Sequence, residues 1–270
     1  MRLIAIAVVL VLTLAAASCG GDGETPVATQ TAPQTVPAIA SPSPTSMGLV
    51  PPRPSSFEDY PAAVASYLNK RGEASAIGSH CLDLFSAWRM PQGRSLSPGT
   101  THGRVGCHIG NTDEDPEYEV IFSLTAGEPS EPIAAKIAVF DETSNGYQVS
   151  YQYSGNDTPI AFLGAWDLNG DGSGDLAFAE ITCGAHTCPW RVHVVTGSGS
   201  TYRELTPQEG LTLATANVRI EDTDGNGTQE VIMHGGIIES VGAGPQRAQT
   251  DVYSWDGTTY SLVSSVEDPA

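Results

Sequence analysis

The stretch "DLNGDGSGDLAF", residues 167 to 178, alternates acidic or amide side chains with glycines and then becomes apolar. Oxygen-bearing side chains stand at loop positions 1, 3, 5 and 9, namely Asp167, Asn169, Asp171 and Asp175. Alternate residues of a tight loop direct their side chains to one point, and calcium takes several oxygen ligands. The glycine at position 6 permits the positive φ of such a turn. The pattern therefore predicts a calcium-binding loop that leads directly into a β-strand.

Similar loops occur at two other places in the chain. "DTDGNGTQEVIM", residues 222 to 233, carries oxygen-bearing side chains at the same four positions: Asp222, Asp224, Asn226 and Glu230. "NTDEDPEYEVIF", residues 111 to 122, carries Asn111, Asp113, Asp115 and Glu119. The loop starts at residues 111, 167 and 222 lie 56 and 55 residues apart. A fixed period of this size indicates a repeat architecture.

The three loops also have similar surroundings. Each is followed by an apolar run suited to a strand, and farther on by a hairpin pattern. A tyrosine follows the turn of each hairpin: Tyr147, Tyr202 and Tyr260. The predicted unit is therefore strand, loop, strand, strand, turn, strand.

The residues at position 12 of the loops exclude an EF-hand, because an EF-hand loop needs a bidentate Glu at this position. The chain has Phe122, Phe178 and Met233 at this position, and the acid lies at position 9 instead. This arrangement resembles the FG-GAP/VCBS repeats of extracellular β-propeller proteins. The resemblance covers about residues 103 to 266. It implies four-stranded blades, and cell-surface adhesion or ligand recognition as broad roles.

The resemblance also implies which residues bind calcium. The ligands of the two complete loops are Asp167, Asn169, Asp171, Asp175, Asp222, Asp224, Asn226 and Glu230. The loop formed by Asn111, Asp113, Asp115 and Glu119 departs from the pattern, because Asn replaces the leading Asp and Pro116 takes the glycine position. Proline fixes φ near −65°, so we expect weak or vestigial metal binding there. A metal-free Asp/Asn/Gly turn is the alternative for all three loops.

The N-terminal part of the chain does not look globular. Residues 1–18 form an apolar segment typical of a signal peptide, and "AAASCG" resembles a bacterial lipoprotein cleavage box. The resemblance implies cleavage before Cys19 and lipidation of its thiol, so the protein is expected outside the cytoplasm, anchored to the bacterial cell membrane or cell surface. An ordinary signal peptide cut nearby is the alternative. Residues 19–56 are rich in Pro, Thr and Ser and are expected to form a disordered tether.

The remainder divides into a helical segment, residues 57–92, and a β-repeat domain, residues 93–270. Start and stop signals predict one helix from Asp59 to Arg71 and a second from about Glu73 to Arg89. The repeats span about 103–155, 159–206 and 213–266. Closed propellers use four to eight blades, and three are visible here. The expected fold is mainly β, with three propeller-like four-stranded repeats after a short two-helix segment.

Four cysteines follow Cys19, and an even number invites pairing in an oxidising compartment. We favour disulfides between Cys183 and Cys188 and between Cys81 and Cys107, although three pairings are possible. Zinc bound by these thiols with His186 or His193 is an alternative.

Composition and motifs narrow the classes of function that we expect for this chain. The net charge of −19 disfavours nucleic acid as a partner, and the chain lacks the common catalytic and phosphate-binding motifs, so an enzyme is not expected. A binding, adhesion or scaffolding module with an unknown protein or glycan ligand is the favoured interpretation. A hydrolase or lyase on a propeller-like scaffold and a purely structural envelope protein are the alternatives. Trp166, Trp190 and Trp255 are candidates for stacking on sugar or peptide, unless they are buried in the blades.

Overall fold

The structure, a computed structural model, describes residues 50–71, 77–90, 106–115, 117–126, 134–155, 158–184, 186–198, 201–238, 242 and 246–269. Several predicted features lie outside the described residues: the signal peptide, Cys19, most of the tether, the second helix start at Glu73, and Pro116 of the first loop. In the described part of the chain, no helix is both long enough and apolar enough to cross a membrane.

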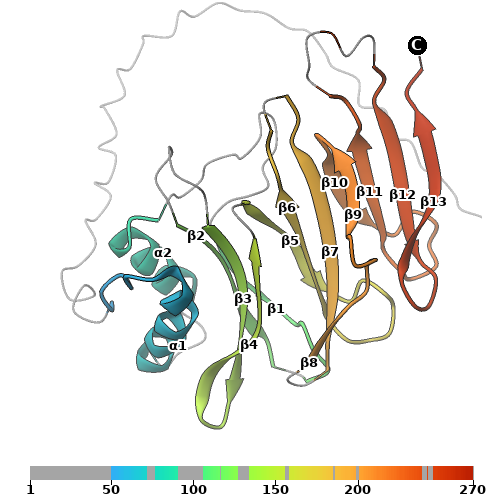
Figure 1. The fold of residues 1–270 in the computed structure, drawn as a ribbon. Coiled ribbons are helices and arrows are strands. Elements are labelled where there is room, and N and C mark those ends of the chain that lie inside the picture. The colour runs from blue at the N-terminus through green and yellow to red at the C-terminus, as the bar shows by residue number, and fades with distance from the viewer. Residues whose placement is uncertain are drawn as a thin grey trace, which may run out of the picture. The chain divides into compact units, whose positions relative to one another are not determined.

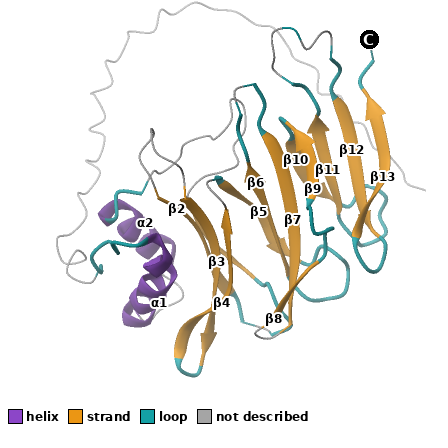
Figure 2. Ribbon diagram, in the orientation of Figure 1, coloured by secondary structure: helices purple, strands orange, loops and turns teal. Residues whose placement is uncertain are grey.

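The described residues are mainly in β-strands, with three antiparallel sheets preceded by a short helical segment (Figures 1 and 2). This confirms the mainly β fold and the helical segment predicted from the sequence. The described strands do not close into a propeller ring.

Two helices precede the sheets. Helix α1 spans Tyr60–Arg71 and α2 spans Ile77–Ala87. A short 3₁₀ turn, η2 (Phe57–Asp59), leads into α1, and the Ser56 hydroxyl accepts a hydrogen bond from a backbone N–H of this turn at 3.3 Å. Ser56 is therefore the N-terminal cap of the 3₁₀ turn that leads into α1.

The first sheet packs against these helices. It contains β1 (Gly106–Gly110), β2 (Glu119–Ala126), β3 (Ala134–Thr143) and β4 (Gly146–Gly155), in that order. An apolar cluster joins Tyr60 of α1 and Trp88, which follows α2, to Phe122 and Phe140 of the sheet. The side chain of Asn69 in α1 also pairs with the backbone of Tyr147, through hydrogen bonds of 2.6 and 3.0 Å.

The second sheet has five strands, one more than predicted. Its strands are β5 (Ile160–Trp166), β6 (Asp175–Ile181), β7 (Pro189–Ser198), β8 (Thr201–Glu204) and β9 (Leu211–Ala214). The difference arises because β7 is ten residues long. Its C-terminal part, from Val195, pairs with β8, and its N-terminal part, up to Val192, pairs with β9.

The third sheet completes the described fold. It contains β10 (Asn217–Glu221), β11 (Glu230–Gly235), β12 (Gln249–Trp255) and β13 (Tyr260–Glu267), in that order. A cluster that includes Trp190, Val231 and Met233 joins it to the second sheet. Another cluster, which includes Val139 and Phe178, joins the second sheet to the first. Each pair of consecutive sheets therefore shares an apolar interface.

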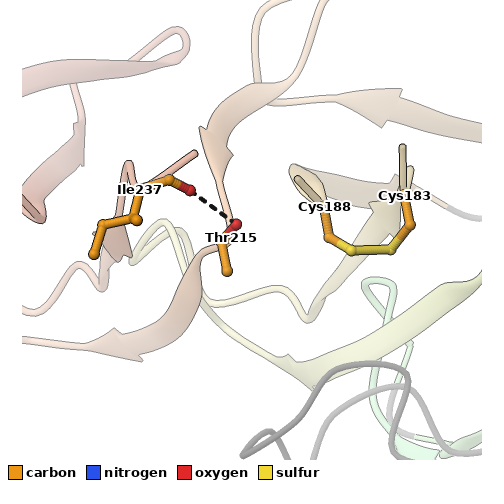
Figure 3. The surroundings of a disulfide bond; sticks show 4 residues. All are labelled: Cys183, Cys188, Thr215 and Ile237. Atoms are coloured by element: carbon orange, nitrogen blue, oxygen red, sulfur yellow. Dashed lines mark hydrogen bonds between the residues drawn. A yellow bond between two sulfur atoms is a disulfide. The ribbon is translucent and has the colours of Figure 1, made fainter. Parts of the chain in front are cut away.

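The structure confirms the favoured disulfide pairing. Cys81 of α2 bonds to Cys107 of β1, and Cys183 bonds to Cys188 in the connection between β6 and β7. Figure 3 shows the second disulfide beside Thr215, whose backbone N–H donates to the carbonyl oxygen of Cys188 at 2.9 Å. The hydroxyl of Thr215 donates to the carbonyl oxygen of Ile237 at 3.1 Å. The disulfide loop is thus tied to the segments that border β10 and β11, and its paired thiols are not free to bind zinc.

Candidate functional site

The three acidic loops occupy equivalent places in their sheets. Each joins the first strand of a sheet to the second: β1 to β2, β5 to β6, and β10 to β11. The acid at position 9 is the first residue of the second strand in every case, and it is buried: Glu119, Asp175 and Glu230. The start of the strand therefore places one carboxylate inside the protein beneath each loop.

The buried carboxylate holds the beginning of its own loop. In each loop it accepts a hydrogen bond from the backbone N–H at position 2: Glu119 from Thr112 at 2.5 Å, Asp175 from Leu168 at 2.9 Å, and Glu230 from Thr223 at 2.8 Å. In the first and third loops, the threonine hydroxyl donates to the same carboxylate oxygen. One oxygen of each position-9 side chain thus anchors the loop backbone.

The side chains at positions 3 and 5 also make the same hydrogen bonds in all three loops. Each accepts from the backbone N–H two residues later, which is an Asx-turn geometry. For position 3 the acceptors are Asp113, Asn169 and Asp224, at 3.0, 2.9 and 3.1 Å. For position 5 they are Asp115, Asp171 and Asn226, at 3.0, 2.8 and 2.7 Å. The three loops therefore share the backbone hydrogen bonds accepted by the side chains at positions 3 and 5.

Position 1 distinguishes the first loop from the other two. Asp167 and Asp222 each accept backbone hydrogen bonds from positions 4 and 6, at 2.7 to 3.1 Å. The position-6 glycines have φ of 90° and 91°, which favours glycine. Asn111 makes a different contact, because its Nδ2 donates to the carbonyl oxygen of Asp115 at 2.9 Å. The substitution at position 1 therefore changes the local hydrogen bonding.

Carboxylates gather in the first loop despite this difference. One carboxylate oxygen from each of Asp113, Asp115 and Glu119 lies within 4.8 Å of the others, and Asp222, Asp224 and Glu230 of the third loop form an equivalent group. In the second loop Asn169 replaces the acid at position 3, and its Nδ2 donates to Asp171 at 3.0 Å. Weak metal binding in the first loop stays a prediction, because its carboxylates, like those of the third loop, lie within 4.8 Å of one another.

Burial makes Glu119 and Asp175, two of the position-9 acids, costly to ionise. It raises the pKa of Glu119 to about 7 and that of Asp175 to about 6. Oε1 of Glu119 is buried and has no hydrogen-bond partner among the described residues, and Asp113 and Asp115 raise the same pKa further by charge repulsion. A bound cation would offset both the burial and the repulsion.

Neighbouring loops contact one another across the sheet interfaces. The backbone N–H of Gly174 donates to the carbonyl oxygen of Asp113 at 3.4 Å. A Cβ added at Gly174 would lie 2.0 Å from the carbonyl oxygen of Asn111, so the two backbones are in close contact. The backbone N–H of Gln229 in the third loop likewise donates to the carbonyl oxygen of Leu168 at 2.8 Å. A loop held in one conformation therefore helps to hold the neighbouring sheet in place.

The hairpin tyrosines make further contacts between the sheets. The hydroxyl of Tyr202 in β8 lies 3.0 Å from that of Thr112 in the first loop. The hydroxyl of Tyr260 in β13 donates to the carbonyl oxygen of Leu168 in the second loop at 3.0 Å. Tyr202 and Tyr260 thus each reach position 2 of the preceding sheet's loop. The sequence shows these tyrosines at a regular spacing, but it does not show what they contact.

A buried histidine cluster was not predicted from the sequence. Nδ1 of His193 lies 3.4 Å from Glu204, and Nε2 lies 3.8 Å from Glu180. The imidazole stacks on Phe178 and lies beside Tyr153 of the first sheet. Burial lowers the pKa of His193, but the two carboxylates outweigh burial and raise it overall. His193 is a buried residue of β7, and its acidic neighbours come from strands that only folding brings together.

The three candidate tryptophans differ in exposure. Trp190 is fully buried and Trp255 is half-buried, and both belong to the cluster between the second and third sheets. Trp166, at the end of β5, remains 40% exposed. Of the three, Trp166 is therefore the one available to a ligand.

Comparison of the chain with known protein families, with curated proteins and with solved structures found no match in any of the three. The features that bear on function are therefore the geometry of the acidic loops and the surface around the exposed Trp166.

Proposed function

We propose that the protein is an extracytoplasmic lipoprotein whose calcium-stabilised β-repeats form a binding, adhesion or scaffolding module. The observation that supports this most is the hydrogen-bond pattern shared by the three acidic loops, each placed between the first two strands of its own antiparallel sheet. A repeated loop in a repeated place agrees with FG-GAP/VCBS-type blades. In this proposal the three sheets form an open propeller-like array.

Calcium is the proposed ion because the loops offer only oxygen ligands. The side chains at positions 1, 3, 5 and 9 are carboxylates or amides, and neither Cys nor His occurs between residues 167 and 175 or between 222 and 230. Such donor sets suit hard cations and not zinc or copper. The proposed ligands are those of the second and third loops: Asp167, Asn169, Asp171, Asp175, Asp222, Asp224, Asn226 and Glu230.

The proposed role of calcium is structural. The second loop contacts both the first loop, through Gly174, and the third, through Leu168. An ion that orders this loop therefore stabilises two sheet interfaces together. With a dissociation constant of ~10 µM and ~1 mM free calcium, one site adds about 2.7 kcal/mol.

The proposed location rests on the N-terminal segment and the cysteines. Residues 1–18 and Cys19 fit a lipoprotein signal, and the following Pro-rich residues would hold the folded part away from the membrane. Two disulfides suit an oxidising compartment. The acidic composition agrees with a surface in contact with extracellular calcium.

A thermal melt of the full-length chain tests the calcium proposal. Millimolar calcium is expected to raise the midpoint by several degrees relative to excess chelator, since each site adds about 2.7 kcal/mol and roughly 1 kcal/mol shifts a domain of this size by about 2–4 °C. The double variant Asp167→Ala/Asp222→Ala should lose this difference. Glu209→Ala, which removes an exposed acid outside the loops, should keep it. Identical wild-type melts in calcium and chelator would show that the loops are plain turns.

A further inference from the structure

A groove lies between the second and third sheets, along the edges of β5 and β10. It encloses about 290 Å³ and is lined by Leu163, Trp166, Asn217, Val218, Arg219, Ile220 and Glu221. Among the described strands, β5 pairs only with β6 and β10 pairs only with β11. All five residues of β10 line the groove, so the free edge of this strand, with its unpaired backbone donors and acceptors, borders it.

Trp166 forms a flat aromatic surface on one side of this groove. A Cβ added at Gly164 would lie only 1.7 Å from a carbon of the six-membered ring of Trp166. The ring therefore rests directly on the backbone at Gly164, which holds it in one orientation. Because 40% of the side chain is exposed, a face or edge of the indole remains free. An exposed aromatic beside a groove is typical of a binding site.

The opposite side of the groove is polar. Arg219 and Glu221 form an ion pair with 2.8 Å between Nη1 and Oε1, and their side chains are 60% and 46% exposed. Asn217 is also exposed, and alternate residues of a strand lie on one face. These three residues supply an amide, a guanidinium and a carboxylate, so both donors and acceptors are present. Their formal charges cancel, although the chain as a whole carries a net charge of −19.

We propose that this groove binds a neutral oligosaccharide, an inference that rests on the proposed binding function and names its ligand class. A sugar ring carries C–H groups on one face and hydroxyls around its rim. The C–H face packs on the electron-rich face of Trp166, as positive aromatic edges do. The hydroxyls pair with Arg219, Glu221 and the free backbone groups of β10.

Size and charge favour this ligand class over others. Small-molecule pockets enclose about 300–1,000 Å³, and this groove, at about 290 Å³, lies just below that range, which suits one or two sugar rings. Its lining residues carry no net charge, so a neutral ligand loses less solvation energy on binding than an ion would. An extended peptide paired to the β10 edge is the competing occupant.

The test uses the full-length chain, in calcium, on immobilised neutral oligosaccharides built from glucose, mannose, galactose, xylose or N-acetylglucosamine. Affinity for any saccharide that binds is then measured by titration calorimetry. Trp166→Ala is expected to lower the affinity about tenfold or more, as for other buried aromatic contacts. Gly164→Ala retains the indole but displaces it, and should weaken binding by several fold.

Tyr118→Ala provides the matched control, because Tyr118 is an exposed aromatic that is not among the residues lining the groove. It should leave saccharide affinity unchanged, and thermal melts of all variants establish that they fold. The proposal is overturned if none of the saccharides binds, if Trp166→Ala binds as tightly as the wild type, or if only peptides compete for the groove.

Repeating the titration in chelator, below the melting temperature, separates this proposal from the calcium proposal. Binding that depends on Trp166 in both conditions supports the saccharide groove even if calcium proves to have no effect on stability. Stabilisation by calcium without saccharide binding would leave the structural proposal standing and remove this one.

Discussion

The two interfaces between consecutive sheets are built from different side chains. The interface between the second and third sheets is a large apolar cluster that includes Trp190, Met233 and Tyr260. The interface between the first and second sheets has a smaller cluster around Phe178. It also contains the imidazole of His193, which lies beside Tyr153 and between two carboxylates. One type of sheet can thus pack mainly through apolar burial or through a mixture of apolar and titratable groups.

This difference means that the two interfaces should respond to different perturbations. Loss of volume should affect mainly the second interface, because burial of large side chains is its main stabilising term. Changes in pH and in loop contacts should affect mainly the first, where His193 is buried and where Gly174 contacts Asn111.

The largest loss of stability is expected from Trp190→Ala. Trp190 is fully buried in the apolar cluster, and its removal leaves a large cavity, so the free energy of unfolding should fall by about 3–5 kcal/mol. Urea denaturation followed by circular dichroism measures this change. Val195→Ala, at the first interface, removes much less volume and should cost less. Equal losses in the two variants would contradict the proposed difference between the interfaces.

A smaller loss of stability is expected from Gly174→Ala. The added Cβ would lie 2.0 Å from the carbonyl oxygen of Asn111, and overpacking against backbone costs about 1–3 kcal/mol of stability. Gly184→Ala is the matched control, since the nearest atom to its Cβ is 3.8 Å away. The same denaturation experiment compares the two variants. If both are as stable as the wild type, the contact between the first and second loops does not support the first interface.

The smallest change in stability is expected when a change in pH alters the protonation of His193. The pKa of His193 is raised in the folded protein, so its protonated form contributes stability that is fully present below the unfolded pKa of about 6.5. This contribution is lost as the pH rises through the folded pKa. The pKa of Glu180 is lowered, chiefly by its interaction with His193 and against the effect of burial. Its contribution is therefore lost at acidic pH, as the pH falls through its folded pKa.

The variant His193→Gln measures this contribution. The wild type should exceed the variant in stability most clearly at about pH 5–6, and the excess should shrink as the pH approaches about 8. The other groups near the imidazole are Glu204, Tyr153 and Arg191, of which Arg191 is half exposed and bonded to Glu180. His234→Gln, at an exposed histidine of the third sheet, is the comparison variant. A parallel offset at every pH would show that His193 contributes only packing.

Local patterns predicted much of the fold. The acidic loops were found because Asp, Asn and Gly at fixed offsets specify a turn before a strand, and this information lies within nine residues. The helical segment and the mainly β fold followed from similarly local signals. The disulfide between Cys183 and Cys188 could be favoured because the two cysteines lie five positions apart in the sequence. The pairing of Cys81 with Cys107 depended on elimination, and folding decided it.

Tertiary structure decided the features that involve several strands. The pairing of β9 with β7 depends on register along a ten-residue strand, which composition does not reveal. The neighbours of His193 come from β6 and β8, and the partner of Tyr260 is a backbone carbonyl 92 residues away. The exposure of Trp166 and the burial of Trp190 are likewise properties of the packed sheets.

The sequence by itself therefore determined the places of the acidic loops and the oxygen-bearing side chains that they present, because turn formation and residue type are local. Which side chains became buried, titratable or available to a ligand was decided only when the sheets packed together. The physical reason is that burial, pKa and groove shape depend on atoms contributed by distant strands, whereas turn formation depends on neighbouring residues.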